Sequence, residues 1–367
     1  MTYSSESFAL DTEILAAVEA WRKHPKPIAG SDFEDLALRL LDYQLRYNRP
    51  YARYCAGFGF APGALPPSWE AIPPVPATAF KEATLTTFDP SNAALAFETS
   101  GTTSRTSGRH YMETRALYDA VLLAGFERAF LANGRRLRYL NAVPNPSERP
   151  QSSLGYMMQR VSATFGDGQT GWYVRGDTLL VDAFLADARG AIQDGAPVCL
   201  AATAFALAGL LEQLERRAVT LQFPPGSCVM ETGGFKGRTR IVERTELYQR
   251  ASLCFGIPTT DIVAEYGMTE LTSQYYDDAN SRGVIDGRRK SGPPWLRARV
   301  VGADGKTLPN GTVGALVHVD LANRSSCVAV ATEDLGVQFP NGLVLIGREA
   351  GASLRGCSLD AETLLPR

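Results

Sequence analysis

Between residues 116 and 258, segments with the hydrophobic spacing of strands alternate with segments that have the spacing of helices. This alternation constrains the fold more than any other feature. The expected strands are 137–143, 198–201, 220–223 and 227–231, and the expected helices are 116–130, 179–192, 205–217 and 240–255. The pattern predicts βαβ units and an α/β fold built on mainly parallel sheets flanked by helices. Such sheets bind ligands beyond the carboxyl ends of their strands.

The segments on either side of this core have different sequence patterns. Helical spacing is found at 11–24 and 31–47, and residues 62–76 carry six prolines. After residue 294, short strands alternate with hairpin-type turns, which predicts a small antiparallel, barrel-like subdomain. We therefore expect three regions: N-terminal helices with a proline-rich lead-in (1–90), the α/β core (91–294), and a small β subdomain with a C-terminal tail (295–367).

Composition excludes several classes of protein. A net charge of −2 gives no indication of nucleic-acid binding, and no apolar run is long enough to span a membrane. The first ten residues lack the features of a signal peptide. The six cysteines are scattered without a C-x-x-C pair, which favours reduced thiols and a cytoplasmic location. The three histidines lie far apart and predict no zinc cluster.

Residues 97–110 combine seven hydroxyl side chains with two glycines and two arginines. They follow an apolar run at 93–96, an expected buried strand, and precede a helix expected to begin near Thr114. Small residues allow close backbone approach, and hydroxyls, N–H groups and arginines bind anionic oxygens. The stretch therefore predicts a polyphosphate-binding loop, although it lacks the Walker spacing. The alternative is a flexible surface loop.

Two more strand-to-loop transitions have the same character. Residues 229–237 run from a strand into Gly233-Gly234, and residues 262–270 run from a strand into Tyr266-Gly267-Met268-Thr269-Glu270. Without further context, the glycine pair is equally consistent with a plain turn, and Tyr266 with a core aromatic residue.

The ordered set of motifs resembles the adenylate-forming superfamily of acyl-CoA synthetases, luciferases and peptide-synthetase adenylation domains. The set consists of the hydroxyl-rich loop, Tyr-Gly-x-Thr-Glu, Thr-Glu-Asp-Leu-Gly, and then Gly-Arg and Arg-Gly, and it covers nearly the whole chain. Within this superfamily, the chain most resembles the bioluminescence acyl-protein synthetases, the long-chain-fatty-acid–luciferin-component ligases. Three features carry this likeness: Pro-Pro-Val-Pro followed by Phe80-Lys81, the loop at 98–103, and the stretch at 355–358. Phenylacetate-CoA ligases are more distant.

The resemblance implies an acid–thiol ligase with a large adenylation-type domain that binds nucleotide and acyl group. With ATP and Mg²⁺, such an enzyme converts a carboxylic acid, here a fatty or other hydrophobic one, into an acyl-adenylate, and a thiol then displaces AMP. It also implies that the usual C-terminal swinging domain is absent. The basic residue that replaces the lysine of that domain is not identified by the sequence.

The resemblance also assigns roles to individual residues. The loop residues would cradle the β- and γ-phosphates, with positive charge from two arginines: Ser100, Gly101, Thr102, Thr103, Ser104, Arg105 and Arg109. Gly233 and Gly234 would lie against the adenine, on which Tyr266, followed by Gly267, would stack.

On the same resemblance, Thr269 would bind the α-phosphate and Glu270 would hold Mg²⁺. Asp334 would accept both ribose hydroxyls, and Arg348 would reach the ribose or a phosphate. The alternatives are a turn residue for Asp334 and a surface ion pair for Arg348.

Cys357 resembles the cysteine near the carboxyl terminus of acyl-protein synthetases, and the resemblance implies that it would accept the acyl group and pass it to a reductase partner. A neighbouring arginine and glycine favour an accessible thiolate. The alternative is a small buried residue. The other five cysteines mostly lie in apolar runs and are interpreted as structural.

Two other functions stay open. One is an acyl-CoA ligase of the phenylacetate-CoA ligase type. The other is a non-catalytic adenylate-binding subunit of a reductase or acyltransferase complex. The identity of the acid, the acyl acceptor (Cys357, CoA or a carrier protein) and the oligomeric state are not determined by the sequence.

Overall fold

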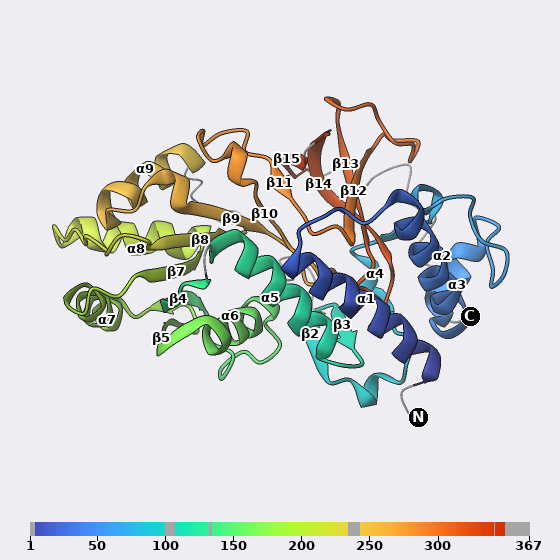
Figure 1. The fold of residues 1–367 in the computed structure, drawn as a ribbon, viewed down its shortest axis with the longest axis horizontal. Coiled ribbons are helices and arrows are strands. Elements are labelled where there is room, and N and C mark those ends of the chain that lie inside the picture. The colour runs from blue at the N-terminus through green and yellow to red at the C-terminus, as the bar shows by residue number, and fades with distance from the viewer. Residues whose placement is uncertain (1–3, 100–106, 132–133, 234–242, 341, 349–367) are drawn as a thin grey trace. The chain divides into compact units, whose positions relative to one another are not determined.

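The computed structural model describes residues 4–99, 107–131, 134–233, 243–340 and 342–348 (Figure 1). The chain divides into two compact units. The first comprises Met1–Ala124, Met268–Gln274 and Ser291–Arg367, and the second comprises Gly125–Gly267 and Tyr275–Lys290. Two elements contain residues of both units: the helix α5 (Ala116–Phe130) and the short strand β11 (Lys290–Ser291).

The second unit contains the parallel sheet that the alternating pattern predicts. Its strands β5, β4, β7, β8 and β9 pair in parallel in that order, and β6 and β10 add antiparallel strands at the two ends. Their bounds are β4 Leu137–Pro144, β5 Gly166–Arg175, β6 Thr178–Leu179, β7 Val198–Thr203, β8 Cys228–Thr232, β9 Ile262–Tyr266 and β10 Tyr275–Asp277.

Helices cover this sheet on both faces. The helices α7 (Val181–Gln193), α8 (Ala204–Arg216) and α9 (Arg244–Phe255) share one hydrophobic core with the strands. A separate aromatic cluster is centred on Phe126 of α5. Its ring contacts those of Tyr139 from β4 and Phe165 from α6 (Ser153–Phe165). Because apolar residues recur on one side of each helix, packing against a sheet is the arrangement that buries them.

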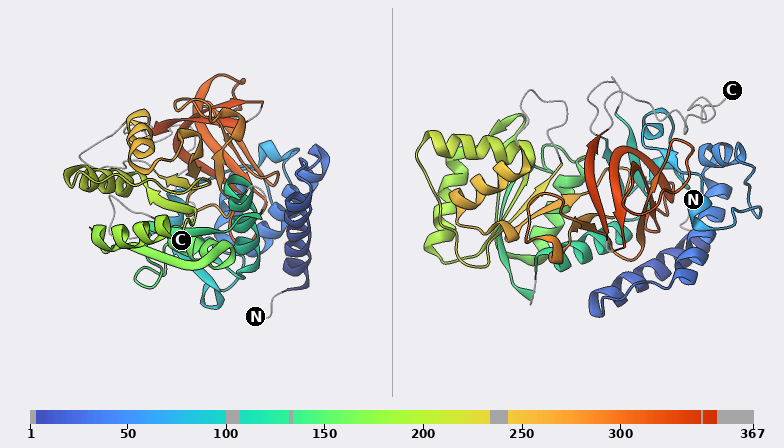
Figure 2. Two further views of the ribbon diagram at one scale, coloured as in Figure 1. Left: turned by 60° about the vertical axis from the view of Figure 1, so that its left-hand side comes forward. Right: turned by 90° about the horizontal axis from the view of Figure 1, so that it is seen from above.

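The first unit combines N-terminal helices with an antiparallel sheet (Figure 2). The helices are α1 (Ser5–Lys23), α2 (Gly30–Tyr47), α3 (Arg49–Ala56) and α4 (Ala79–Glu82). Strands pair antiparallel in the order β12 (Leu296–Val301), β13 (Val313–Asp320), β14 (Ala329–Phe339) and β15 (Gly342–Arg348), as predicted, and β1 (Val75–Pro76) joins β14 in parallel. None of the described helices is long and apolar enough to cross a membrane.

Three local expectations were wrong. The run at 93–96 is not a fully buried strand, since β2 (Leu95–Glu98) is buried only at Phe97. The hydroxyl-rich loop leads into a second strand, β3 (Arg109–Met112), and not directly into the helix. Residues 220–223 form no strand, because the N–H groups of Leu221 and Phe223 donate to carbonyls at the end of α9.

Candidate functional site

The stem of the hydroxyl-rich loop is an antiparallel hairpin of β2 and β3, whose last pair is Glu98 opposite Arg109. Beyond this pair, the Thr99 N–H donates to the Gly108 carbonyl over 2.8 Å, and the Gly108 N–H donates to Thr99 Oγ1 over 3.0 Å. The stem therefore fixes where the loop begins and ends. The loop residues with predicted roles lie outside the described residues: Ser100, Gly101, Thr102, Thr103, Ser104 and Arg105.

The lead-in residue Phe80 packs against this stem. A Cβ at Gly108 would lie 2.8 Å from both the carbonyl carbon and the carbonyl oxygen of Phe80, so only glycine allows the two backbones to approach this closely. The Phe80 ring also meets the His110 ring edge-on, with centroids 5.6 Å apart. The short helix α4 therefore packs directly against the stem.

The turn that carries Thr269 and Glu270 lies directly against the same stem. Thr269 Oγ1 donates to the carbonyl of Glu98, the last residue of β2, over 3.4 Å. The Thr269 carbonyl accepts from His110 Nδ1, on β3, over 2.7 Å. Two motifs that are far apart in the sequence are thus neighbours within the first unit.

Asp320 and Asn323 hold the rest of this turn. Asp320, at the end of β13, accepts from the N–H of Thr272 over 3.0 Å and of Ser273 over 2.8 Å, and from the Ser273 hydroxyl over 2.8 Å. Asn323 Oδ1 accepts from the Thr272 N–H and hydroxyl, each over 2.7 Å, and its Nδ2 donates to the Glu270 carbonyl over 2.9 Å. Burial raises the pKa of the Asp320 carboxyl to about 6.

The N-terminal helices anchor the segment that contains Asn323. Gln44 on α2 donates to the Asn323 carbonyl over 2.8 Å and accepts from the Val328 N–H over 2.8 Å. The buried Arg324 forms two bonds with Asp11 on α1, over 2.7 and 3.0 Å. Because buried polar groups need partners, these contacts hold the segment in one conformation.

Glu270 is the predicted metal ligand, and only 8% of its surface is exposed. Among the described residues there is no cluster of three or more His, Cys, Asp or Glu side chains that could enclose a metal ion. Mg²⁺ is commonly held by one or two carboxylates together with substrate phosphates. A buried glutamate next to the stem of the hydroxyl-rich loop is compatible with that mode of binding.

Asp334 and Arg348 are paired in the backbone register of β14 and β15. Asp334 is half-buried, and its N–H donates to Thr332 Oγ1 over 3.1 Å. A register irregularity follows at Leu335 and Gly336. Such irregularities re-aim side chains at functional positions. The predicted pair therefore lies side by side on adjacent strands of the first unit.

The predicted adenine contacts lie at the carboxyl edge of the parallel sheet in the second unit. Gly233 follows β8 with a φ of +72°, a conformation that favours glycine, and Tyr266 is the last residue of β9. Gly267 comes next, and Gly234 lies outside the described residues. The Tyr266 ring is tilted against that of Tyr275, with centroids 5.8 Å apart.

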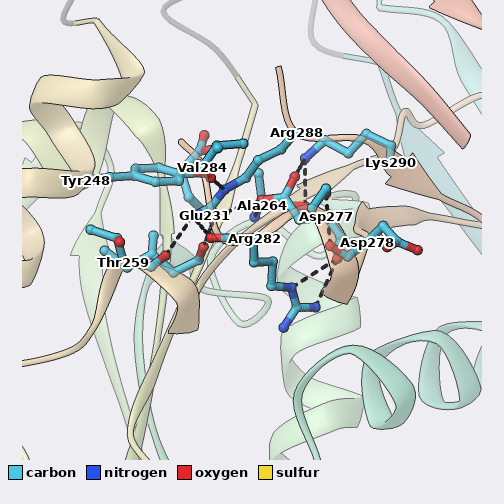
Figure 3. A network of polar contacts seen from close by, with 12 residues as sticks. Glu231, Tyr248, Thr259, Ala264, Asp277, Asp278, Arg282, Val284, Arg288 and Lys290 are labelled. Carbon is cyan, nitrogen blue, oxygen red and sulfur yellow. Dashed lines mark hydrogen bonds and ion pairs between the residues drawn. The ribbon is translucent and has the colours of Figure 1, made fainter. Parts of the chain in front are cut away.

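A buried network of charges is hydrogen-bonded to β9, the strand that ends at Tyr266 (Figure 3). Asp277 accepts from the Ala264 N–H over 2.9 Å and from Lys290 Nζ over 2.6 Å, while Lys290 also donates to the Ala264 carbonyl over 2.9 Å. Arg288 donates to the Ile262 carbonyl over 2.6 Å. Both polar groups of Ala264, two residues before Tyr266, are therefore tied to one ion pair.

Arg109 is one of the two arginines predicted to neutralise phosphate charge. In the structure it belongs to β3, and its Nη2 lies 3.0 Å from Glu98 Oε1 across the hairpin. Its side chain is about half exposed. A role toward phosphate stays a prediction.

Five of the six cysteines are free and buried: Cys55, Cys199, Cys228, Cys254 and Cys327. Burial raises the pKa of the Cys55 thiol to about 12 and that of Cys254 to about 11. This confirms the structural interpretation of these residues. Cys357 lies outside the described residues.

The predicted residues thus divide between the two units. Thr269, Glu270 and the loop stem adjoin within the first unit, which also carries Asp334 and Arg348, while Gly233, Tyr266 and Gly267 belong to the second. The sequence prediction missed His110, Asp320 and Asn323 as residues that build the site. The only local signal was the polar run after the strand that ends at Asp320.

A known protein is similar in sequence to this chain over almost its whole length. A "Long-chain-fatty-acid--luciferin-component ligase" of Vibrio harveyi is 23% identical over 374 residues, which cover 96% of this chain and 94% of the relative.

Solved structures share the fold. A 2-hydroxyisobutyryl-CoA ligase in complex with 2-HIB-AMP and CoA matches with a TM-score of 0.63 and 15% identity, over 87% of this chain and 76% of that one. ATP-bound MatB from Rhodopseudomonas palustris matches with a TM-score of 0.52 and 17% identity, over 71% of this chain and 49% of that one. This chain spans about half the length of several such structures, MatB among them.

The family model described as "Acyl-protein synthetase, LuxE" matches residues 31–362, nearly the whole sequence. The chain therefore belongs to the LuxE family of acyl-protein synthetases and is a ligase of that family.

Proposed function

We propose that the protein activates a carboxylic acid with ATP, forming an acyl-adenylate and pyrophosphate, and then transfers the acyl group to a thiol. One observation carries the first step: the Thr269–Glu270 turn is hydrogen-bonded to the stem of the hydroxyl-rich loop through Glu98 and His110. The Thr269 hydroxyl and the buried residue Glu270 therefore lie next to the stem from which the hydroxyl-rich loop extends, which supports the proposal.

The activation step is a substitution at the α-phosphorus. A carboxylate oxygen of the acid forms the new bond to phosphorus, and the bond to the bridging oxygen of pyrophosphate breaks. Charge neutralisation and positioning dominate such reactions. The Thr269 hydroxyl would contact the α-phosphate, Asp334 the ribose hydroxyls, and Glu270 would hold Mg²⁺, which supplies positive charge to the phosphates. Gly233, Gly234 and Tyr266 stay predicted adenine contacts.

The acyl acceptor is proposed to be Cys357. Its sulfur would attack the acyl carbon, forming a thioester while AMP leaves with the bonding electron pair. The five other cysteines are buried, so they are poor nucleophiles. The chain matches the Vibrio harveyi ligase over nearly its full length. By that likeness we propose a long-chain acid as substrate and a reductase as the partner that receives the acyl group.

Exchange of labelled pyrophosphate into ATP tests the activation step. We would measure it with Mg²⁺ and a panel of acids from acetate to palmitate. The proposal predicts exchange that rises with chain length and is lost in Glu270→Gln. Binding of ATP without exchange for any acid would instead support the non-catalytic alternative.

The transfer step has a separate test. With ATP, Mg²⁺ and a radiolabelled acid, the protein should acquire label that hydroxylamine removes, since thioesters are labile to it. Cys357→Ser should abolish this label and leave pyrophosphate exchange intact. Label that persists in Cys357→Ser contradicts the assignment. Free acyl-CoA formed on addition of CoA, without labelled protein, would favour the acyl-CoA ligase.

A further inference from the structure

We propose that His110 is a positioning residue, which holds the Thr269–Glu270 turn in place against the stem of the hydroxyl-rich loop. The inference rests on the proposed function, because it assigns a role within the activation step. His110 does not touch the reacting groups in this role. It acts through the backbone of Thr269.

The ring is buried, with 1% of its surface exposed, and both of its nitrogens have partners. Nδ1 lies 2.7 Å from the Thr269 carbonyl, and Nε2 lies 2.9 Å from the Ser326 hydroxyl. A carbonyl oxygen can only accept a hydrogen bond, so the proton resides on Nδ1. Nε2 then accepts from the Ser326 hydroxyl.

These contacts make the ring a bridge between three segments that are distant in the sequence. His110 belongs to β3, two residues after Gly108, which closes the loop stem. Thr269 and Ser326 lie 159 and 216 positions further along the chain. The edge-on contact with Phe80 restricts the ring from another side. Packing and two directed hydrogen bonds leave the ring a single orientation.

The segment that contains Ser326 also holds the turn directly. Asn323 donates to the Glu270 carbonyl, while His110, oriented by Ser326, donates to the preceding carbonyl of Thr269. Two consecutive peptide groups are thereby fixed, on either side of the residue proposed to bind the metal. Small displacements of such groups cost large factors in rate.

The chemistry of histidine allows a discriminating experiment. In an asparagine side chain, the amide nitrogen can take the place of Nδ1 and donate to the Thr269 carbonyl. In glutamine, the amide reaches the place of Nε2 and leaves that carbonyl without its donor. Each variant loses one of two buried hydrogen bonds, so the two should be destabilised by similar amounts.

We would therefore measure kcat and KM of pyrophosphate exchange, together with urea midpoints, for His110→Asn, His110→Gln and His110→Ala. We expect about a tenfold or larger fall in kcat for the glutamine and alanine variants, and a fall of less than about threefold for asparagine. Ser326→Ala, which keeps the donor to Thr269, should lower kcat less than His110→Gln. Asn and Gln variants of the exposed His24 are the matched controls, for which no difference is expected.

Several results would overturn the inference. Unchanged kcat in all three His110 variants would do so, as would equal losses for asparagine and glutamine that follow the urea midpoints, which would indicate a structural role alone. A larger loss in Ser326→Ala than in His110→Gln would also contradict it. Absence of exchange in the wild-type chain is distinct from these, because it overturns the proposed function and this inference with it.

Discussion

Asn323 donates from Nδ2 to the carbonyl oxygen of Glu270 over 2.9 Å, and its Oδ1 accepts two hydrogen bonds from Thr272. Nδ2 also donates to the Cys327 carbonyl over 3.1 Å. All four hydrogen-bonding positions of a buried amide are therefore used, and the backbone of the proposed metal ligand is part of that arrangement.

Asn323→Asp is expected to destabilise the protein. The variant keeps the shape of the side chain, but it removes two donors and places a carboxylate near the buried Asp320. We expect a loss of about 2–4 kcal/mol in the free energy of unfolding, measured with urea. The exposed Asn280 provides the control, since Asn280→Asp should change stability by less than about 0.5 kcal/mol. Equal effects at the two sites would contradict the assignment.

Glu270→Gln should leave the fold intact and lower the rate of pyrophosphate exchange by at least about a hundredfold. Removing one group that stabilises charge in the transition state typically costs about 3 kcal/mol. The concentration of Mg²⁺ that gives half-maximal exchange should also rise. Glu19→Gln, on the exposed surface of α1, should change neither quantity. A folded Glu270→Gln variant with full activity would rule out the metal-binding role.

Gly108→Ala should destabilise the loop stem, because the added methyl group would lie 2.8 Å from the backbone of Phe80, which cannot move aside like a flexible side chain. Overpacking of this kind costs about 1–3 kcal/mol. Gly190, inside α7, has open space around its Cβ position, so Gly190→Ala should instead stabilise the protein by about 0.5–1 kcal/mol. Relative to the wild-type chain, the denaturation midpoint should therefore decrease in Gly108→Ala and increase in Gly190→Ala.

Lys290→Met should be among the more destabilising substitutions in the second unit. It leaves the buried Asp277 without its nearest cation and the Ala264 carbonyl without its donor. Breaking one partner of a buried ion pair costs about 3–5 kcal/mol. Lys306 pairs with Asp304 at the surface over 3.7 Å, so Lys306→Met should cost less than about 1 kcal/mol. Comparable losses in thermal or urea unfolding would refute this reading of the network.

Acid should destabilise the protein through its two buried histidines. Burial lowers the pKa of His110 and His318 to about 4, whereas a histidine in the unfolded chain titrates near 6.5. The unfolded state therefore binds more protons between these values, and the free energy of unfolding falls as the pH decreases from about 6.5 to about 4. Asp320, with its pKa raised to about 6, opposes part of this change.

His318→Gln isolates the contribution of one histidine. The urea midpoint should decrease less between pH 7 and pH 5 in this variant than in the wild-type chain. The reason is that one group that takes up a proton on unfolding has been removed. An equal fall in the two proteins would show that His318 does not contribute to the acid sensitivity.

Local patterns were sufficient for most of the core fold. The helix expected at 116–130 coincides with α5, and the strands expected near 137, 198 and 227 form β4, β7 and β8 of a parallel sheet. Hydrophobic spacing reports which side of an element is buried, and it identified these elements. It did not identify α6, although that helix is also largely buried. It also failed for β5, which begins with glycines and polar residues and is exposed at half of its positions. It also failed at 220–223, where prolines follow and the partner is a helix end.

The sequence by itself determined the family, the alternating core and the motifs at the ends of its strands. Only the tertiary structure decided that Thr269 bonds to Glu98, 171 positions away, and that His110 lies between Thr269 and Ser326. Residue type and spacing record local preferences, whereas a hydrogen bond between distant segments forms only after the chain has closed the loops between them. The same holds for Asp320 and Asn323, which are ordinary polar residues until folding places their donors and acceptors around one turn.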